Sequence, residues 1–283
     1  MNLIEIAVKT ALEAGDAILE IYEQDFEVEY KADESPLTSA DKASHNIIVQ
    51  ALETTPYPVL SEESAEIGYD ERKEWSTYWL VDPIDGTKEF IKKNGEFTVN
   101  IALVKNGVPV LGVVYVPVVE TLYVGRENGA FKAIKGQHYQ NQEDLLAKLP
   151  DLENFQPLKV SGKPSGPLRV VASKSHCNEE TVAFIAELEE KYGKAALVSK
   201  GSSLKLCMVA EGSADIYPRI APTMEWDTAA ADAVVRAAGG KVFEYVKEVR
   251  SSDYLCTNES VKEVPYNKKN LLNPYFVVSG LGE

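Results

Sequence analysis

The sequence predicts an α+β layered sandwich made of two subdomains. At 283 residues the chain is long for a single hydrophobic core, and its 45% hydrophobic and 26% charged residues are typical of globular proteins. Helix-like patterns precede strand-like patterns in the first half, and the two alternate in the second half. A polar, irregular stretch at 137–156 separates the halves, so we expect subdomains at 1–156 and 157–283.

In the first half, helical patterns precede strand patterns. Apolar residues three or four apart predict a helix over 2–24, and 26–30 alternates like a strand. Thr38 has the chemistry of an N-cap for a helix ending near Glu53. A break follows at 54–58, and we expect a charged surface loop at 68–75.

The rest of this half predicts an antiparallel sheet under those helices. Residues 97–104 alternate and meet 110–116 across Asn106-Gly107, which is a hairpin signal. A further short strand is expected at 121–124. The boundary stretch contains one short helical pattern, at 145–149.

The second half alternates between strands and helices. We expect strands at 169–172, 196–198, 215–217 and 241–243, and helices at 179–192, 203–210 and 228–238. Gly239-Gly240 is a good stop for the last of these helices.

The most informative stretch is 79–90. Trp79-Leu80-Val81 is typical of the end of a buried strand, Pro83 should stop the ladder, and Gly86 permits a tight turn before a short helix from Thr87.

Asp82 and Asp85 therefore share one turn at the edge of a sheet. Two carboxylates held so close repel each other, and a hard cation such as Mg²⁺ compensates them. The N–H groups of Gly86 and Thr87 suit a phosphate oxygen. The turn alone is equally consistent with an ordinary polar Asp-Gly corner, and its spacing does not fit an EF-hand.

Three other acidic turns lie where an element starts or stops. Glu62 precedes Asp82 by 20 residues and follows a similar apolar run, with Glu63 as a competing carboxylate. Asp227 comes just before an Ala-rich helix, where an acidic residue is also favourable for helix electrostatics alone. Asp41 lies three residues after Thr38 and has the spacing of the acidic partner in a capping box.

The net charge of −15 argues against nucleic-acid polymers as partners. It is also unfavourable for a phosphorylated substrate, unless metal ions bound by the carboxylates attract the phosphate. No apolar run approaches the roughly 20 residues of a membrane span, and the N-terminus lacks a signal-peptide pattern. Three widely spaced cysteines are typical of reduced thiols in a cytoplasmic protein.

Three of these motifs together resemble a known family. Asp-Pro-Ile-Asp-Gly-Thr at 82–87, the upstream Glu-Glu at 62–63 and the downstream Trp-Asp-Thr-Ala-Ala at 226–230 are similar to the signatures of the inositol monophosphatase superfamily of Mg²⁺-dependent phosphatases. The runs at 78–104, 173–176, 201–205 and 217–219 resemble its bacterial 3′(2′),5′-bisphosphate nucleotidase branch. The resemblance covers nearly the whole chain and implies an αβαβα layer order.

The resemblance also implies a site. It places two or three Mg²⁺ ions at Glu62, Asp82, Asp85 and Asp227, with the backbone carbonyl of Ile84 as a further ligand. It makes Thr87 and Asp41 a catalytic pair, in which Asp41 takes the proton that a threonine hydroxyl cannot hold alone.

Further residues are expected to contact the substrate. The predicted contacts are Glu62, Ile84, Asp85, Gly86, Thr87, Ser173, His176, Gly201, Lys205, Arg219 and Asp227. Four of these keep structural alternatives: His176 as an ordinary structural histidine, Gly201 as a helix turn, Lys205 as a solvated lysine, and Arg219 as a salt-bridge partner. His45 and His138 have no chemical context and are interpreted as structural.

The implied reaction is hydrolysis of adenosine 3′,5′-bisphosphate to AMP and phosphate in sulfate assimilation, with the phosphosulfate form as a second substrate. The alternatives are activity on inositol phosphates or fructose 1,6-bisphosphate, and a non-catalytic nucleotide-binding regulator. We expect a monomer or homodimer in the cytoplasm, which leaves peripheral association with the membrane open.

Overall fold

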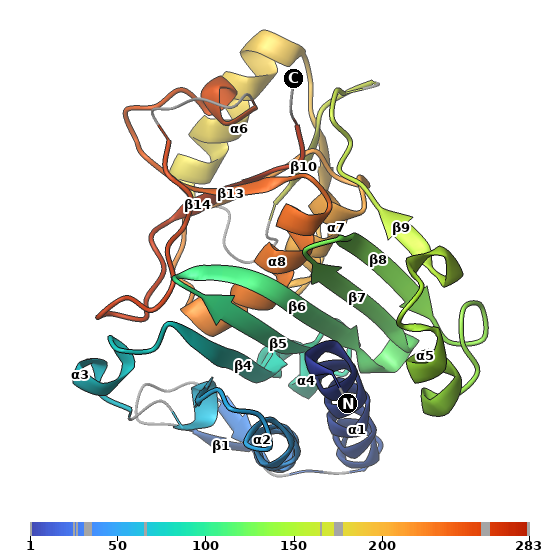
Figure 1. The fold of residues 1–283 in the computed structure, drawn as a ribbon. Helices are drawn as coiled ribbons and strands as arrows, with labels where there is room; N and C mark the ends of the chain where they lie inside the picture. The colour runs from blue at the N-terminus through green and yellow to red at the C-terminus, as the bar shows by residue number, and fades with distance from the viewer. Residues whose placement is uncertain are drawn as a thin grey trace.

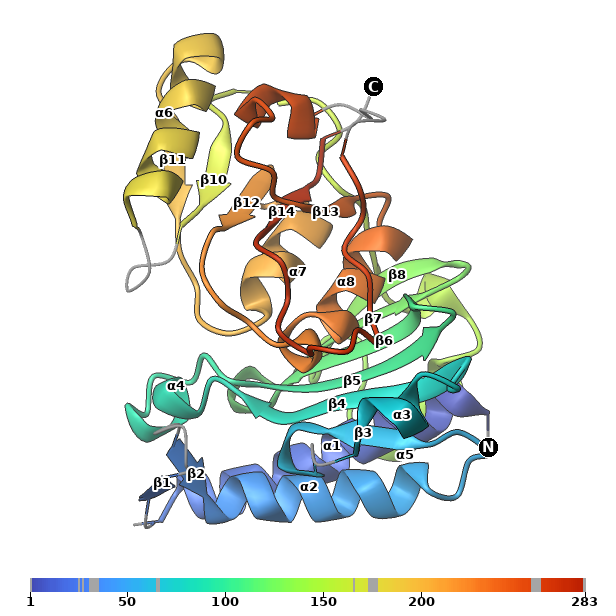
Figure 2. The ribbon, with the colours of Figure 1, turned by 90° about the vertical axis from the view of Figure 1, so that its left-hand side faces the viewer.

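The computed structural model describes residues 2–24, 26, 28–30, 36–64, 67–164, 166–172, 178–255 and 261–281. In this part of the chain, helices and two large sheets stack in the order helix, sheet, helix, sheet, helix (Figures 1 and 2). This order confirms the α+β sandwich expected from the sequence. No helix within the described ranges is long and apolar enough to cross a membrane.

The first helical layer consists of α1 (Leu3–Tyr22) and α2 (Ser39–Leu52). The side chain of Asn2 caps α1 by accepting the N–H of Glu5 at 2.9 Å. The apolar faces of both helices are buried against one face of the large sheet. A small antiparallel pair, β1 (Val28–Tyr30) and β2 (Pro36–Thr38), leads into α2. Both helices confirm the predicted ranges to within one or two residues.

The large sheet has the strand order β3-β4-β5-β6-β7-β8-β9. Its strands are β3 (Val59–Ser61), β4 (Thr77–Asp85), β5 (Thr98–Lys105), β6 (Val108–Val116), β7 (Thr121–Arg126), β8 (Gly129–Ile134) and β9 (Gln156–Leu158). The β3–β4 pair is parallel and the remaining pairs are antiparallel. The predicted hairpin at Asn106-Gly107 is confirmed, since both residues adopt positive φ in the β5–β6 turn.

The middle layer consists of α7 (Leu204–Ala210) and α8 (Ala229–Ala237). The alanines of α8 and two sheet glycines let this helix approach the large sheet closely. A Cβ at Gly112 would overlap the Ala230 carbonyl, and one at Gly125 would lie 2.5 Å from the Ala233 carbonyl. This close packing fixes the start of α8 over the edge of the large sheet that carries the acidic turns.

The second sheet has the order β11-β10-β12-β14-β13. Its strands are β10 (Arg169–Val171), β11 (Ala196–Val198), β12 (Ile216–Arg219), β13 (Lys241–Glu244) and β14 (Phe276–Ser279), and β10 runs parallel to both β11 and β12. The outer helix α6 (Glu179–Tyr192) and the 3₁₀ turn η5 (Ser251–Leu255) cover its far face. The strands and helices predicted for this half are confirmed, and β14 was missed.

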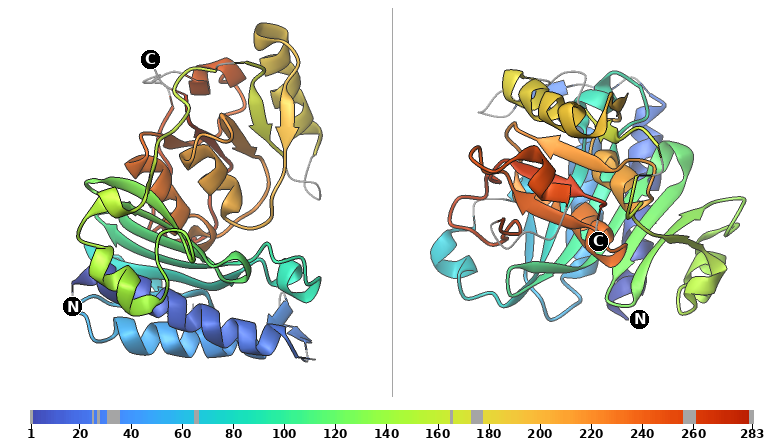
Figure 3. Two further views of the ribbon diagram at one scale, coloured as in Figure 1. Left: turned by 90° about the vertical axis from the view of Figure 1, so that its right-hand side faces the viewer. Right: turned by 90° about the horizontal axis from the view of Figure 1, so that it is seen from above.

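Short elements complete the chain. They are η1 (Glu62–Ser64), α3 (Tyr69–Arg72), α4 (Thr87–Ile91), η2 (Pro117–Val119), α5 (Gln142–Lys148), η3 (Leu152–Asn154) and η4 (Glu225–Asp227). The expected surface loop at 68–75 is wrong in part, because it forms α3 and buries Arg72 to 3% exposure. The helix α5 lies beside α1 (Figure 3).

Two sequence expectations need qualification. The β4–β5 ladder breaks after Asp82, but pairing resumes between Asp85 and Thr98, so Pro83 interrupts the strand without ending it.

The expected boundary at residue 156 falls where the two halves are in contact. The strand β9 begins at Gln156 and pairs with β8, and the second-half helices pack on the large sheet. The division at residue 156 therefore stays a prediction.

Candidate active site

Two neighbouring parallel strands bring the first acidic turns together. The register pairs Leu60 with Leu80 and Ser61 with Val81. The next residues, Glu62 and Asp82, therefore emerge side by side at the same edge of the sheet. This is the physical reason for the 20-residue spacing seen in the sequence.

The turn after β4 is shaped by local backbone contacts. The N–H of Ile84 donates to Asp82 Oδ1 at 3.1 Å, which folds the turn around that side chain. Gly86 has a φ of 98°, in the left-handed region, and α4 begins directly after it. The predicted tight turn and short helix are confirmed.

The helix α2 brings Asp41 to this turn. Asp41 Oδ2 accepts the backbone N–H of Thr38 at 2.7 Å and the Thr38 hydroxyl at 2.6 Å. The hydroxyl of Thr87 donates to Asp41 Oδ1 at 3.3 Å and lies 3.4 Å from the Ile84 carbonyl oxygen. One carboxylate thus closes the start of a helix with one oxygen and contacts the proposed catalytic threonine with the other.

The same face of α2 makes two further contacts with the acidic turns. Ser44 donates its hydroxyl to the Pro83 carbonyl at 2.8 Å, and His45 Nδ1 lies 2.9 Å from Ser61 Oγ. The spacing of Asp41, Ser44 and His45 places them on one side of a helix. His45 therefore has the site context that sequence reasoning did not find, beside the residue that precedes Glu62.

Asp227 reaches the same place from the second half. It ends η4 just before α8, and its Oδ2 accepts the Met224 N–H at 2.9 Å. We call Glu62, Asp82, Asp85 and Asp227 the acidic cluster.

The members of the acidic cluster interact electrostatically. Burial raises the pKa of Asp82 well above its ordinary value, and the negative charges of Glu62 and Asp85 add to the rise. Burial likewise raises the pKa of Asp227, with Asp85 as the next cause. These carboxylates therefore need positive charge from outside the cluster to ionise together.

The donor chemistry of the cluster fits Mg²⁺. Carboxylate oxygens and the Ile84 carbonyl are hard ligands, and no sulfur or imidazole belongs to the set. Within the described ranges, no three His, Cys, Asp or Glu side chains converge tightly enough to enclose an ion by themselves. The ligand assignment of Glu62, Asp82, Ile84, Asp85 and Asp227 therefore stays a prediction.

Asp85 is held by the segment that precedes α7. Its Oδ2 accepts the hydroxyl of Ser202 at 2.6 Å and the N–H of Ser203 at 2.5 Å. Burial raises the pKa of Asp85, while these hydrogen bonds act in the opposite direction. The contacts leave Asp85 Oδ1 as the atom available to an ion.

Two buried polar residues of β5 anchor that segment in turn. Thr98 Oγ1 lies 2.7 Å from Ser202 Oγ, and Ser203 donates to Asn100 Oδ1 at 2.9 Å. Sequence reasoning gave no role to any of these four residues. Polar side chains inside an otherwise apolar strand were the signal that could have identified Thr98 and Asn100.

A cleft of about 610 Å³ opens from Asp85 and Asp227. Its lining includes the cations Lys88, Lys92, Lys200, Lys205 and Arg219, together with Gly86 and Gly201. Cations beside an acidic cluster suit a ligand that carries several phosphates. The structure thus brings the predicted substrate contacts Asp85, Gly86, Gly201, Lys205, Arg219 and Asp227 to one cleft.

Two of these cations differ in how they are held. Burial lowers the pKa of Lys205, and the charge of Asp85 acts against that change. Within the described part of the chain, Lys205 Nζ makes one long hydrogen bond, of 3.4 Å, to the Lys200 carbonyl. Arg219 donates Nη2 to the Pro222 carbonyl at 3.1 Å, whereas its buried Nε finds no hydrogen-bond partner among the residues that the structure describes.

Gly201 has a structural reason to be glycine. Its N–H donates to Glu96 Oε2 at 2.7 Å, and a Cβ would lie 2.9 Å from both the Cβ and the carbonyl oxygen of Glu96. The close approach therefore involves the protein itself, and a direct ligand contact at Gly201 stays a prediction. Ser173 and His176 lie outside the described residues, so their expected contacts stay predictions as well.

Comparisons with known proteins agree with this geometry. Residues 1–276 match the inositol monophosphatase family. The chain is 41% identical over 281 residues to the 3′(2′),5′-bisphosphate nucleotidase CysQ of Salmonella typhimurium, covering 98% of this chain and 99% of that protein. The identity to the Escherichia coli protein of the same name is 42%, with the same coverage.

A solved structure extends the similarity to the fold. The crystal structure of CysQ from Bacteroides thetaiotaomicron, described as a bacterial member of the inositol monophosphatase family, superposes with a TM-score of 0.80. It is 47% identical in sequence, and the match covers 97% of this chain and 95% of that one.

Proposed function

This chain belongs to the inositol monophosphatase family, and we propose that it is a Mg²⁺-dependent 3′(2′),5′-bisphosphate nucleotidase. The proposed reaction converts adenosine 3′,5′-bisphosphate and water into AMP and phosphate, which serves sulfate assimilation. The phosphosulfate form is the second proposed substrate. The names of the CysQ relatives support this choice within the family.

One structural observation carries the proposal. The cleft places Asp85 and Asp227 in the same cavity as Lys205 and Arg219. A nucleoside bisphosphate has two phosphates, of which one is cleaved and one is retained. The acidic cluster with its ions suits the first, and the two cations suit the second.

The residues of the chain have separate tasks in this reaction. Glu62, Asp82, Asp85, Asp227 and the Ile84 carbonyl would hold Mg²⁺, in two or three ions. When bound, Mg²⁺ supplies positive charge to the phosphate and lowers the pKa of the attacking water. Gly86 and Thr87 lie at the start of α4 and would present their backbone N–H groups to a phosphate oxygen.

Thr87 and Asp41 handle the proton. The Thr87 hydroxyl accepts a proton from the attacking water as it passes its own to Asp41 Oδ1, with which it already shares a hydrogen bond. The new P–O bond forms as the bond between phosphorus and the 3′-oxygen breaks. The leaving 3′-oxygen takes a proton from solvent water and remains on AMP as the 3′-hydroxyl, and Asp41 then releases its proton to solvent.

The test is a phosphate-release assay on a panel of substrates. Adenosine 3′,5′-bisphosphate, its phosphosulfate form, inositol 1-phosphate and fructose 1,6-bisphosphate are each assayed with Mg²⁺ and with EDTA. We expect the highest kcat/KM for the adenosine bisphosphate and no turnover in EDTA. The Asp85→Asn variant controls for contaminating phosphatases.

The alternatives predict different results. A preference for inositol 1-phosphate or fructose 1,6-bisphosphate would assign the chain to another activity of the family. Binding of the nucleotide without phosphate release from any substrate would indicate a regulator. Either result contradicts the proposed nucleotidase.

Three finer properties belong to the same proposal. We propose a monomer or homodimer, to be measured by light scattering, and two or three ions, to be counted by calorimetry. We also propose a cytoplasmic location, supported by the free, buried thiol of Cys207. Fractionation of cells would test the location and any association with the membrane.

A further inference from the structure

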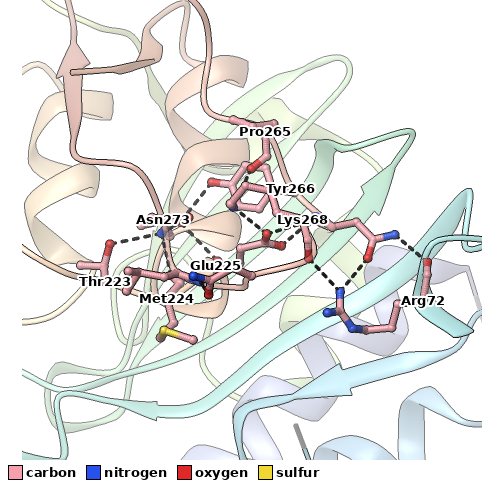
Figure 4. A network of polar contacts seen from close by, with 12 residues as sticks. Arg72, Thr223, Met224, Glu225, Pro265, Tyr266, Lys268 and Asn273 are labelled. Carbon is pink, nitrogen blue, oxygen red and sulfur yellow. Dashed lines mark hydrogen bonds and ion pairs between the residues drawn. The ribbon is translucent and has the colours of Figure 1, made fainter. Parts of the chain in front are cut away.

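The element that carries Asp227 is covered by a segment that does not belong to the acidic cluster. We call residues 266–273 the strap. At one end, the Tyr266 N–H donates to the Gly107 carbonyl in the β5–β6 turn at 3.2 Å. At the other, the Asn273 N–H donates to the Thr223 carbonyl at 2.8 Å. Between these points the strap lies against η4 (Figure 4).

Glu225 is the centre of the contact between η4 and the strap. Its side chain is 0% exposed, and its Oε1 accepts the Lys268 backbone N–H at 2.9 Å and the Lys268 ammonium at 2.6 Å. Its Oε2 accepts the Asn267 N–H at 2.7 Å. A buried carboxylate is stable as an anion when it is paired in this way. The Glu225 N–H also donates to the strap, at the Leu271 carbonyl.

The strap holds the residues on both sides of Asp227. Asn273 Nδ2 donates to the Met224 carbonyl at 2.7 Å and to the Thr228 hydroxyl at 3.1 Å. The Tyr266 hydroxyl lies 3.1 Å from the same Thr228 oxygen and donates to Asp232 Oδ2 at 2.9 Å. The Met224 N–H orients the Asp227 carboxylate. The contacts of the strap with Met224 and Thr228 therefore hold the backbone on both sides of Asp227 in place.

The strap is also bound to the first half of the molecule. Arg72, the last residue of α3, donates Nη1 to Asn267 Oδ1 at 3.0 Å and to the Lys268 carbonyl at 3.3 Å. Asn267 Nδ2 returns a hydrogen bond to the Arg72 carbonyl at 2.7 Å. Figure 4 shows Arg72 reaching the strap from α3. The strap therefore joins η4 to the half that carries Glu62, Asp82 and Asp85.

We propose that Glu225, through its ion pair with Lys268, is a positioning residue that holds Asp227 at the acidic cluster and thereby sets the affinity for Mg²⁺. Asp227 is repelled by the cluster's other carboxylates, so a separate attachment is needed to keep it there. The Glu225–Lys268 pair supplies that attachment without touching substrate or ion. The inference rests on the proposed function, because it takes Asp227 as a ligand of Mg²⁺.

The experiment compares two buried ion pairs of similar geometry. Glu225→Gln and Lys268→Met remove one charge each from the pair on the strap. Asp215→Asn is the matched control, since Asp215 is 1% exposed and pairs with Arg169 at 2.6 Å, outside the contacts described for the strap and η4. Mg²⁺ alone is titrated into each full-length protein by calorimetry, and thermal unfolding is recorded in parallel.

We expect the two strap variants to bind Mg²⁺ about 10–100-fold more weakly, the range typical for residues that orient metal ligands. Lys268→Arg, which keeps the positive charge, should retain most of the affinity. The Asp215→Asn control should lose thermal stability and keep its affinity for Mg²⁺. Steady-state assays should show a matching rise in the Mg²⁺ concentration needed for half-maximal turnover.

Two results would overturn the inference. One is an unchanged Mg²⁺ affinity in both strap variants, and the other is an equal loss in the Asp215→Asn control. If Glu225→Gln does not fold, Lys268→Met decides, because Lys268 is 22% exposed and Glu225 keeps both backbone donors.

Asp227→Asn separates this inference from the proposed function. Wild-type Mg²⁺ affinity in that variant would refute Asp227 as a ligand. Loss of binding in Asp227→Asn, together with full binding in Glu225→Gln and Lys268→Met, would refute only the positioning role.

Discussion

Two groups of carboxylates in this molecule differ in the charges that surround them. In the second half, Asp215, Glu225 and Asp232 each pair with a cation at 2.6 Å and are at most 1% exposed. In the acidic cluster, Asp82 is also 1% exposed, but its largest electrostatic influences are other carboxylates. Asp82 is therefore as buried as the three paired carboxylates, and the sign of the neighbouring charges distinguishes it from them.

The difference separates structural from functional charge. A buried carboxylate that is paired with a cation is satisfied within the chain and stabilises its packing only modestly. A buried carboxylate that faces other carboxylates costs free energy, which a bound cation can offset. Metal ions at the acidic cluster would offset part of the net charge of −15 where a phosphorylated substrate binds.

The largest expected effect comes from removing the cation or a ligand charge from the acidic cluster. EDTA should abolish turnover and excess Mg²⁺ should restore it. Asp85→Asn should lower kcat/KM by orders of magnitude, because it keeps the shape of the side chain and removes its charge. Full turnover in EDTA, measured as phosphate release, would refute the hypothesis that the acidic cluster works through bound metal ions.

The next largest effect is expected at Asp41, which has a structural role at the start of α2 and a proposed catalytic role beside Thr87. Asn can still cap α2 through Thr38, so Asp41→Asn should cost at most about 1 kcal/mol of stability. It cannot take a proton from Thr87, so kcat should fall by about 10²–10⁴ while Mg²⁺ binding survives.

A double-mutant cycle with Thr87→Val tests whether the two residues act as one unit. The double variant should be little worse than either single variant in kcat at saturating Mg²⁺. Calorimetry with Mg²⁺ provides the control for metal binding. Additive losses would leave Asp41 with its capping role alone.

A smaller effect is expected at the cationic side of the cleft. Lys205→Ala should raise the KM for adenosine 3′,5′-bisphosphate roughly tenfold or more, the loss expected for one charge-assisted hydrogen bond. It should affect a simple monophosphate ester much less, since such an ester has no second phosphate. The matched control is Lys191→Ala, in the outer helix α6. Equal changes in KM for both substrates would show that Lys205 does not select the bisphosphate through its second phosphate.

Sequence patterns predicted the parts of the fold that local physics determines. The helix cap at Thr38, the hairpin at Asn106-Gly107 and the helix 179–192 each depend on neighbouring residues, and the structure confirms them. The missed strands β9 and β14 pair with distant segments, which a single sequence does not display. The missed strand β8 instead forms a local hairpin with β7 across Glu127-Asn128, so its signal lay in neighbouring residues.

The same distinction applies to the site. The acidic turns were visible because each lies where an element starts or stops, and the structure brings them close together. The contacts of Asp85 with Ser202 and Ser203 span more than 100 residues, and those of Glu225 with Lys268 span 43. Sequence spacing carries no information about such pairs, so they required the folded chain.

Substitution of Asp215 should have the smallest effect on turnover. Its effect on the stability of the fold nevertheless tests the comparison between the paired carboxylates and the acidic cluster. Burial tends to raise the pKa of this carboxyl, but the hydrogen bonds from the Arg169 side chain and backbone outweigh it, so the pKa lies below its ordinary value of 3.8. The stability that Asp215 contributes is therefore present above pH 3.8 and is lost as the pH falls through the lowered value.

Asp215→Asn should consequently destabilise the fold by roughly 1–3 kcal/mol at neutral pH, because Arg169 loses a buried charged partner. In EDTA, Asp82→Asn should have the opposite sign, since it removes a charge that burial and neighbouring carboxylates disfavour. Denaturant unfolding of both variants in EDTA measures the pair of effects at neutral pH. Repeating the Asp215→Asn measurement below pH 3.8 should show a smaller difference in stability from wild type, because protonation weakens the ion pair of Asp215 with Arg169 there.

Destabilisation of the same size in both variants at neutral pH would contradict the comparison. It would mean that the carboxylates of the acidic cluster are stabilised within the chain and do not require a cation.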